Sequence, residues 1–316
     1  MASYLTSNTL IESIKRRAML PASQSTFSDN DFLALANEEM NIGIVPSIIL
    51  QHQNYLQAKQ NQPLLPNTSQ YPIPYRAIGN MLMDVFYVDT SLNYFEMTRI
   101  SKSDLPDFNG PYTQGYARLF YVENNEIVIF PTITGQVSGS IEMEYYVRPN
   151  QLVTEDRVGI ITGIDTVTGD VNIDKVPTAF GSTNLYDFIQ IVSPHKTLSY
   201  DNPVLSINTL TKTITFDPTL LPQGLAVGDH VNLAEESIIP QIPSDLHVVL
   251  AHRVAARCLE ALGDTQGLQN ANTKLAEMEI KTANLINNRV ENAPLKVVSR
   301  NNHIHRGLTS RRFRRR

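Results

Sequence analysis

The spacing of hydrophobic residues changes twice along the chain, from helical to strand-like and back to helical. This order of spacings constrains the fold more than any other sequence feature. Apolar residues recur at steps of three and four near both ends, as on one face of an α-helix. Between the ends they alternate, or form short runs bounded by turn residues, as in β-strands. Amphipathic helices must bury their apolar stripes. The order therefore predicts an α+β fold, with N- and C-terminal helices in one antiparallel bundle and a large inserted all-β lobe, a small barrel or sandwich.

The first 60 residues predict three helices. Thr9 opens the first with a Thr-x-x-Glu capping box, and Ser28 is the expected N-cap of the second. Gly43 is placed to end the second helix, and Pro46 fits the first turn of the third. The expected helices cover residues 9–18, 28–43 and 46–60.

Prolines mark the change from helix to strand. The segment "QPLLPNTSQYPIPYRAIGN" contains four prolines, which favour extended or turn geometry. Next, "ARLFYVENNEIVIFP" predicts a hairpin, and the alternation in "GSIEMEYYVRP" predicts a strand with one buried and one wet face. Short runs between residues 157 and 235, separated by Gly, Asp, Asn and Pro, predict a second small barrel or sandwich.

Helical spacing returns near the C-terminus. Leu246, Leu250, Val254 and Cys258 follow one another at steps of four, and Gly263 is placed to end this helix. A further helix follows before Pro294, and Cys258 is expected to be an inert buried thiol. The expected divisions are N-terminal helices at 1–62, a β region at 63–156, a second β unit or insertion at 157–240, C-terminal helices at 241–293 and a basic tail at 294–316.

Charge is segregated between this tail and the rest of the chain. From Pro294 to the end there are eight positive and no negative side chains, and five of them are arginines in the last six positions. Because the whole chain has a net charge of −5, the preceding 293 residues carry −13. We expect the tail to be disordered when the protein is alone and to act as an interaction segment.

The tail leaves several interpretations open. It could be a solvated tail that aids solubility, a contact to nucleic acid phosphates, or a segment that docks into an acidic groove on another protein. Arginine favours bidentate recognition of carboxylate or phosphate without deciding between them. The candidate docking residues are Arg306, Arg311, Arg312, Phe313, Arg314, Arg315 and Arg316.

The sequence contains no recognisable catalytic motif. It lacks a phosphate-binding loop, a dinucleotide-binding glycine pattern, zinc-ligand spacing and a nucleophile elbow. The acidic pairs Glu38–Glu39 and Glu235–Glu236 are of the kind found on protein surfaces. We therefore expect no catalytic residue, metal site or cofactor, and no enzyme activity. No apolar run predicts a signal peptide or a membrane span, so a reducing, aqueous compartment without a membrane partner is expected.

Several phrases, taken in order, resemble the head-to-tail adaptor (connector or neck ring) proteins of short-tailed bacteriophages. They are "FSDNDFLALANEEM", "YPIPYRAIGNMLMDVFYVD", "ARLFYVENNEIVIFPTITG", "SIEMEYYVRPNQL" and "PQIPSDLHVVLAHRVAARCLEALGD". The resemblance covers most of residues 5 to 290. The insertion at about 157–235 makes the chain more similar to the ring proteins of crAss-like podoviruses than to minimal connectors.

The resemblance implies a structural virion protein at the head–tail junction, assembled in the host cytoplasm. Such proteins form a ring, commonly of twelve copies, between the portal protein and the next tail or neck ring. Viral DNA would pass through the ring without sequence-specific binding, and the tail at 306–316 would dock on the portal. Two alternatives remain: a ring or hub farther down the tail, and a DNA-binding protein that uses its basic tail.

Overall fold

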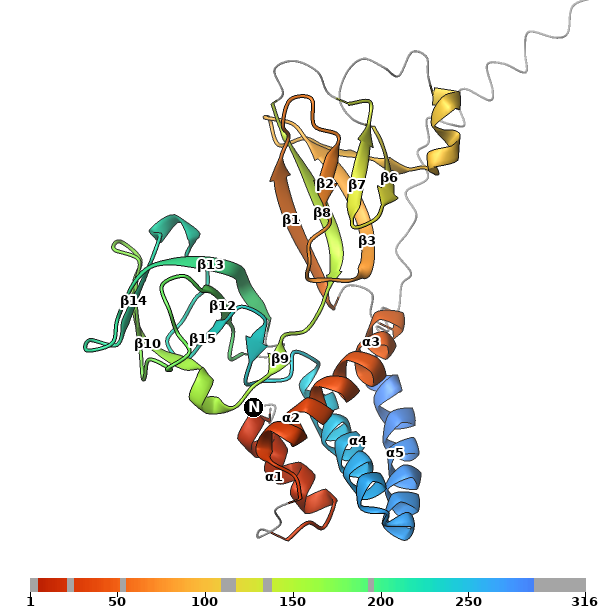
Figure 1. The fold of residues 1–316 in the computed structure, drawn as a ribbon, viewed down its shortest axis with the longest axis vertical. Coiled ribbons are helices and arrows are strands. Elements are labelled where there is room, and N and C mark those ends of the chain that lie inside the picture. The colour runs from red at the N-terminus through yellow and green to blue at the C-terminus, as the bar shows by residue number, and fades with distance from the viewer. Residues whose placement is uncertain are drawn as a thin grey trace, which may run out of the picture.

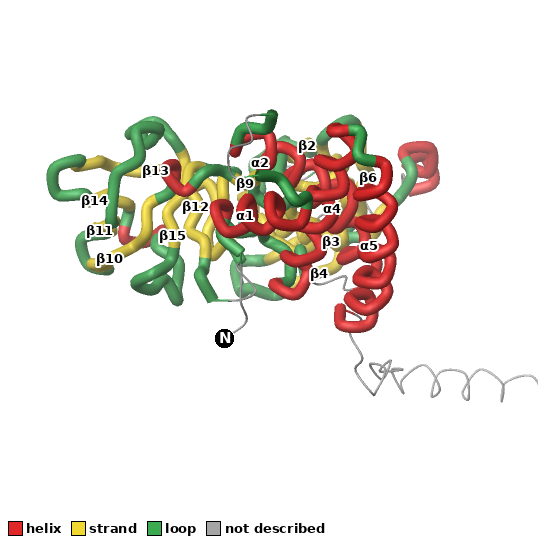
Figure 2. Tube along the Cα trace, turned by 90° about the horizontal axis from the view of Figure 1, so that it is seen from below, coloured by secondary structure: helices red, strands yellow, loops and turns green. Residues whose placement is uncertain are grey.

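The computed structural model describes residues 5–21, 26–51, 55–108, 118–132, 138–192 and 196–286. It has three parts: a group of helices from both ends of the chain, an upper lobe of two β-sheets, and a β-barrel beside them (Figure 1). Figure 2 shows the same parts from below, with the barrel to one side of the helices. The mixed α+β class expected from the sequence is confirmed.

The N-terminal helices differ from the prediction in where they end. Ser28 forms the expected cap, because its side chain accepts a hydrogen bond from the Asp31 N–H while the Asp31 carboxylate accepts one from the Ser28 N–H. Gly43 does not end the helix, since the chain continues through a π-helical segment without a break. The elements are α1 (Ser7–Arg17), α2 (Asp29–Glu38), the π-helix η1 (Glu39–Ile44) and α3 (Val45–Gln51).

The predicted third helix is wrong from Tyr55 onward. Residues Gln57–Pro63 form strand β1, which pairs antiparallel with β8 (Ser140–Val147) over its whole length. Their sequence, "QAKQNQP", has only Ala58 buried and offers no helical stripe to the core. The hydrogen bonds available from β8 therefore decide the conformation of this polar segment.

Helix α4 (Ser244–Leu262) lies at the centre of the helical part. Helices α1, α2 and α5 (Thr265–Ile286) and the π-helix all pack on it. Its residues Leu250, Val254 and Cys258 are fully buried, and Gly263 ends it with φ +74°. Burial raises the pKa of the Cys258 thiol to about 11, which fits the expected inert side chain.

The helices do not form a separate regular bundle. Their hydrophobic cluster continues into the sheets of the upper lobe, where it includes Ile127, Ile141 and Met143. The helical part and the upper lobe therefore share one core. The bundle expected from the sequence is only partly realised, because α2, η1 and α3 lead directly into this lobe (Figure 1).

The upper lobe consists of two four-stranded sheets, ordered β1-β8-β3-β4 and β2-β7-β6-β5. The predicted hairpin is confirmed as β6–β7. The strand predicted to have one wet face, β8, is instead central, and Glu142 and Glu144 on its expected wet face are buried. The remaining strands are β2 (Gln70–Pro72), β3 (Ala77–Val88), β4 (Tyr94–Glu96), β5 (Thr98–Arg99), β6 (Leu119–Glu123) and β7 (Glu126–Phe130), and a 3-10 turn, η2, covers Lys102–Phe108.

The second β unit is a closed six-stranded barrel with its own core. Tyr186, Phe188 and Phe216 meet inside it, with ring centroids 4.9 to 6.0 Å apart. The strands, in the order β10-β11-β14-β13-β12-β15, are β10 (Gly159–Asp165), β11 (Asp170–Ile173), β14 (Thr213–Phe216), β13 (Thr197–Asn208), β12 (Leu185–Ile189) and β15 (His230–Leu233). A short parallel pair, β9 (Gln151–Leu152) and β16 (Glu236–Ser237), connects the barrel to the other parts.

One continuous helix, Asp29–Gln51, has the length and mean hydropathy (1.2) of a membrane span. Its residues Phe32, Ala36 and Met40 are fully buried against the rest of the protein. A core helix of a globular protein meets the same criterion, so length and composition are weak evidence for a membrane here.

Candidate functional site: the arginine junction between the lobes

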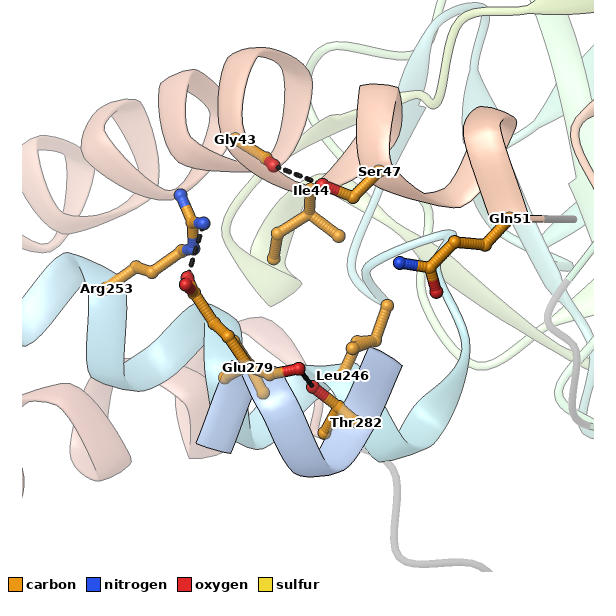
Figure 3. Close-up of a pocket in the computed structure, with 9 residues that line it drawn as sticks. Gly43, Ile44, Ser47, Gln51, Leu246, Arg253, Glu279 and Thr282 are labelled. Carbon is orange, nitrogen blue, oxygen red and sulfur yellow. Dashed lines mark hydrogen bonds and ion pairs between the residues drawn. The ribbon is translucent and has the colours of Figure 1, made fainter. Parts of the chain in front are cut away.

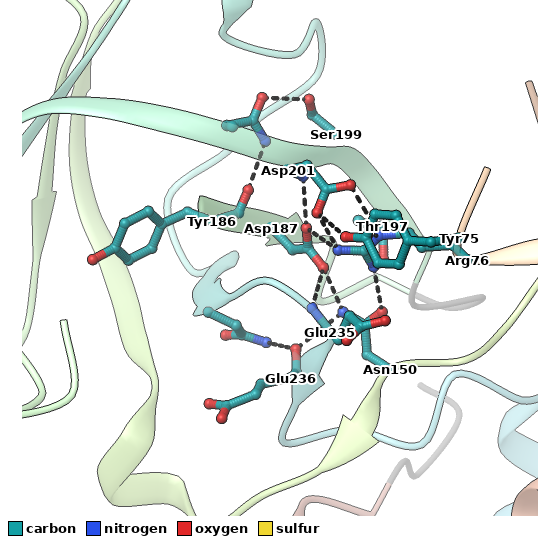
Figure 4. Close-up of polar contacts among 12 residues, drawn as sticks. Tyr75, Arg76, Asn150, Tyr186, Asp187, Thr197, Ser199, Asp201, Glu235 and Glu236 are labelled. Atoms are coloured by element: carbon teal, nitrogen blue, oxygen red, sulfur yellow. Dashed lines mark hydrogen bonds and ion pairs between the residues drawn. The ribbon is translucent and has the colours of Figure 1, made fainter. Parts of the chain in front are cut away.

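Arg76, immediately before β3, lies where the three parts of the protein meet (Figure 4). Only 3% of it is exposed. Its Nη2 donates to Asp187 at 3.0 Å and to Asp201 at 2.6 Å, and its Nη1 donates to the side-chain oxygen of Asn150 at 3.1 Å. We call Arg76, Asn150, Asp187, Asp201 and Gln241 the arginine junction.

The carboxylate of Asp187 is the buried counterpart of Arg76. It is fully buried on β12 and accepts hydrogen bonds from four donors. They are Arg76 Nη2, the Asn150 side chain at 2.8 Å, and the backbone N–H groups of Asp201 at 2.9 Å and Glu235 at 3.1 Å. Burial raises the pKa of Asp187, and these donors oppose it. The carboxylate oxygens of Asp187 are buried away from water, and these four donors satisfy their hydrogen-bonding capacity.

Asp201 reaches Arg76 because β13 is irregular at this point. The β12–β13 register shifts on either side of Phe188, and Asp201 has φ +56°. Such a bulge re-aims a side chain out of the ladder. Burial favours a neutral Arg76, but the hydrogen bond to Asp201 and the charges of Asp187 and Asp201 outweigh it and raise the pKa of Arg76. The guanidinium is therefore charged throughout the stable pH range.

Two tyrosines close the junction around the guanidinium. The Arg76 guanidinium carbon lies 4.9 Å from the ring centroid of Tyr200 and 5.4 Å from that of Tyr75. The Tyr75 hydroxyl also donates to Asp201 at 2.5 Å. Burial raises the pKa of both tyrosines to about 12, so both remain neutral. Stacking over an aromatic face further stabilises a desolvated cation.

Asn150 and Gln241 extend the junction to the helices. Gln241, which precedes α4, accepts from the Asn150 N–H at 2.8 Å and donates to Thr197 of the barrel at 2.7 Å. Asn150, between β8 and β9, also donates to the backbone oxygen of Glu236 at 3.1 Å. The arginine junction therefore connects the upper lobe, the barrel and the helical part to one another.

The chemistry of the junction is structural. Its cation and carboxylates are mutually satisfied, and Arg76 and Asp187 are closed off from solvent, so no group is positioned to attack or protonate a substrate. In the described part of the chain, no group of three His, Cys, Asp or Glu residues could hold a metal ion. What the junction can do is hold the barrel in a fixed orientation.

A second charged cluster connects the π-helix to the C-terminal helices. Glu39, expected on the surface, is buried; its carboxylate accepts from Arg257 Nε at 2.7 Å and from Arg253 Nη1 at 3.2 Å. Arg253 also binds Glu279 of α5. Arg253 and Glu279 line a cavity of about 170 Å³ between η1, α3, α4 and α5 (Figure 3). The expected surface pair is therefore half wrong: Glu38 is exposed and Glu39 is not.

Replacing Glu39 with glutamine is expected to lower the free energy of unfolding by about 2 kcal/mol. The buried Glu39 loses its charge, which weakens its two charge-assisted hydrogen bonds to the partly exposed arginines. Chemical denaturation measures the change. The adjacent substitution Glu38→Gln is the matched control. Glu38 is exposed, and its carboxylate lies 4.0 Å from Arg257, which is a long and weak ion pair. Its loss should therefore cost less than about 0.5 kcal/mol. Equal effects would contradict the role given to Glu39.

The residues predicted to dock on a partner, Arg306 to Arg316, lie outside the described residues. The arginine junction was not predicted at all. Its one sequence signal is the phrase "PYRAIG", an arginine at the start of an apolar strand, where a charge needs a partner.

Comparison with protein-family models identifies a family for this chain. The family model of the SU10 adaptor protein matches residues 6–169, which is more than half of the 316-residue chain. The matched stretch runs from α1 through the upper lobe into the β10–β11 turn, so it includes Arg76 and Asn150 but not their barrel partners. No curated protein matches the chain. The chain therefore belongs to the SU10 adaptor protein family, a family of phage head-to-tail adaptors.

Proposed function

We propose that this protein forms a ring, commonly of twelve copies in such adaptors, that joins the capsid portal to the tail and surrounds the DNA channel at the head–tail junction. The family match over residues 6–169 is the observation that carries this proposal. Its partners are then the portal protein, adjacent tail or neck rings, and further copies of itself. The viral DNA passes through without sequence-specific binding.

A connector transmits force between two large assemblies, so its own parts must keep a fixed geometry. The arginine junction supports this role, because the buried Arg76–Asp187 ion pair and the hydrogen bonds from Asn150 to Asp187 and from Gln241 to Thr197 tie the barrel to the other two parts. Hydrogen bonds to charged groups are also directional, which favours one orientation of the barrel over alternatives.

The acidity of the first 293 residues supports the passage of DNA. A net charge of −13 repels phosphate, so DNA within a ring of such subunits stays mobile. A basic lining would bind the phosphates and hold the genome in place.

The arginines of the tail are the proposed docking residues for the portal. A basic tail can wrap an acidic or groove-shaped surface, and its ordering is coupled to binding. Because docking uses arginine, we expect bidentate pairs with carboxylates of the partner.

Replacing Arg311, Arg312, Arg314, Arg315 and Arg316 with serine is expected to abolish binding to the portal protein without changing the melting temperature. The physical reason is that the five charges carry the docking contacts, whereas the cores of the described residues do not include them. Pull-down of the tagged protein from nuclease-treated infected lysate, with mass spectrometry of retained proteins, measures binding.

The same five positions changed to lysine serve as the control, because they keep the charge and lose the bidentate geometry. Portal binding by the lysine variant but not by the serine variant would show that positive charge is sufficient for docking. Recovery of tail proteins only, equally by all variants, would contradict portal docking and favour a ring farther down the tail. A steep salt dependence of DNA affinity that disappears with the serine variant would instead favour DNA binding by the tail.

A further inference from the structure

Strand β1 is an edge of its sheet, and one side of its backbone has no strand partner among the described residues. The Val147 N–H donates to the Leu56 oxygen at 2.8 Å, and the Leu64 N–H donates to the Gly139 oxygen at 3.1 Å. Hydrogen-bonded pairs alternate in an antiparallel ladder. Between these two ends, the even-numbered residues of β1 therefore bond to β8, and Gln57, Lys59 and Asn61 direct their backbone groups to the open edge.

Proteins usually protect such an edge with an outward-pointing charge. Lys59 is the only charged residue of β1, and it is bound across the sheet to Glu142 at 3.0 Å and Glu144 at 2.5 Å. Pro63 limits pairing at one end, because it has no N–H. Over residues 57–61 the edge is therefore open to a further strand.

Two grooves run along this edge, between β1 and strand β13 of the barrel. One, of about 280 Å³, is lined by residues 55–59 on one side and by residues 196–198 and Tyr200 on the other. The other, of about 660 Å³, continues along residues 59–62 and reaches Tyr75 and Asp201. A strand needs about 4.8 Å beside its neighbour, and the two hollows together follow β1 over most of its length.

The C-terminal segment of the chain starts close to this edge. Thr282, one turn before the end of α5, and Gln51, at the end of α3, line the same cavity. β1 begins six positions after Gln51. Eight residues separate Ile286 from Leu295, and this stretch spans about 30 Å when extended. The six positions from Gln51 to Gln57 span about 20 Å at most, so residues after 294 can reach the edge within one subunit.

The sequence after Pro294, "LKVVSR", is suited to a strand. It alternates between two rows, one of which carries Lys296 and Arg300, and it contains the β-branched pair Val297 and Val298. The positive charge of the tail also complements the −13 of the preceding residues.

We propose that residues 295–300 add to the open edge of β1 as a further strand, in the groove between the upper lobe and the barrel. The backbone groups of Lys59 and Asn61 supply the hydrogen bonds. Residues 306–316 then emerge from a fixed point on the surface. This docking is independent of what the arginines at the tip bind.

Residue-resolved hydrogen exchange on the full chain tests the proposal. The expected result is protection of the outward amides of Lys59 and Asn61. The double substitution Val297→Pro and Val298→Pro should make both exchange about tenfold faster. Successive N–H groups of a strand point to opposite sides, so one of the two prolines must remove a donor that faces β1. The amides of Gln60 and Gln62, which bond to β8, should not change.

Thr309→Pro with Ser310→Pro is the matched control, because it places two prolines in the same tail outside the proposed strand. It should leave all four amides unchanged. Unprotected Lys59 and Asn61 in the full chain, or protection that survives the prolines at 297 and 298, would overturn the proposal. Protection that increases with protein concentration would assign the edge to a second copy instead. None of these outcomes involves the portal, so they do not depend on the proposed function.

Discussion

Replacing Arg76 with methionine is expected to lower the free energy of unfolding by about 3–5 kcal/mol. The substitution keeps the apolar stem and removes the only cation that contacts Asp187 among the described residues. Asp187 is fully buried, so its carboxylate then stays in a low-dielectric site without a counter-charge. Asp201 is 27% exposed and can be hydrated, so most of the loss comes from Asp187. Urea denaturation monitored by circular dichroism measures it.

Two further variants separate this explanation from a simple loss of packing. Arg148→Met removes an exposed arginine near Asn150 and should change stability by less than about 0.5 kcal/mol. Adding Asp187→Asn to Arg76→Met removes the uncompensated charge and should recover most of the loss. If the double variant is as unstable as the single one, the unpaired carboxylate is not the cause.

The junction could not have been predicted from the sequence, because its partners are far apart in the chain. Arg76 is separated from Asp187 by 111 positions and from Asp201 by 125. Local patterns report periodicity and some caps. The Ser28 capping box, the steps of four in α4 and the Gly263 cap were predicted correctly. The Thr9 capping box was wrong, because α1 begins at Ser7 after an N-cap at Thr6. Contacts of this range depend on how the barrel closes, which no local signal encodes.

The errors in the secondary structure have a related origin. Residues 57–63 are polar and lack either period, so their conformation depends on β8, about 85 residues later. Gly43 is placed as a helix end should be, yet the π-helix continues through it and leaves room for the Arg253 guanidinium, which a Cβ there would overlap. In both cases tertiary contacts override the local preference.

The barrel has a hydrophobic core separate from that of the helices and upper lobe, so it should respond to a core substitution by itself. Replacing Phe216 with alanine is expected to destabilise the barrel by about 3–5 kcal/mol. Phe216 is fully buried and touches both Tyr186 and Phe188, so its removal opens a cavity that the closed barrel cannot fill. Helix α4 belongs to the other cluster and loses no contact in it.

Native-state hydrogen exchange distinguishes local from global loss. Amides of Val171 and Val231 in the barrel should exchange faster by a factor that corresponds to the full destabilisation, whereas those of Leu250 and Val254 in α4 should be nearly unchanged. Leu210→Ala is the control, because Leu210 lies in the β13–β14 turn and is 93% exposed. Equal acceleration in barrel and helices would mean that the arginine junction couples them into one cooperative unit. In that case Arg76→Met combined with Phe216→Ala should separate the two transitions, because the junction is the polar cluster that ties the barrel to both other parts.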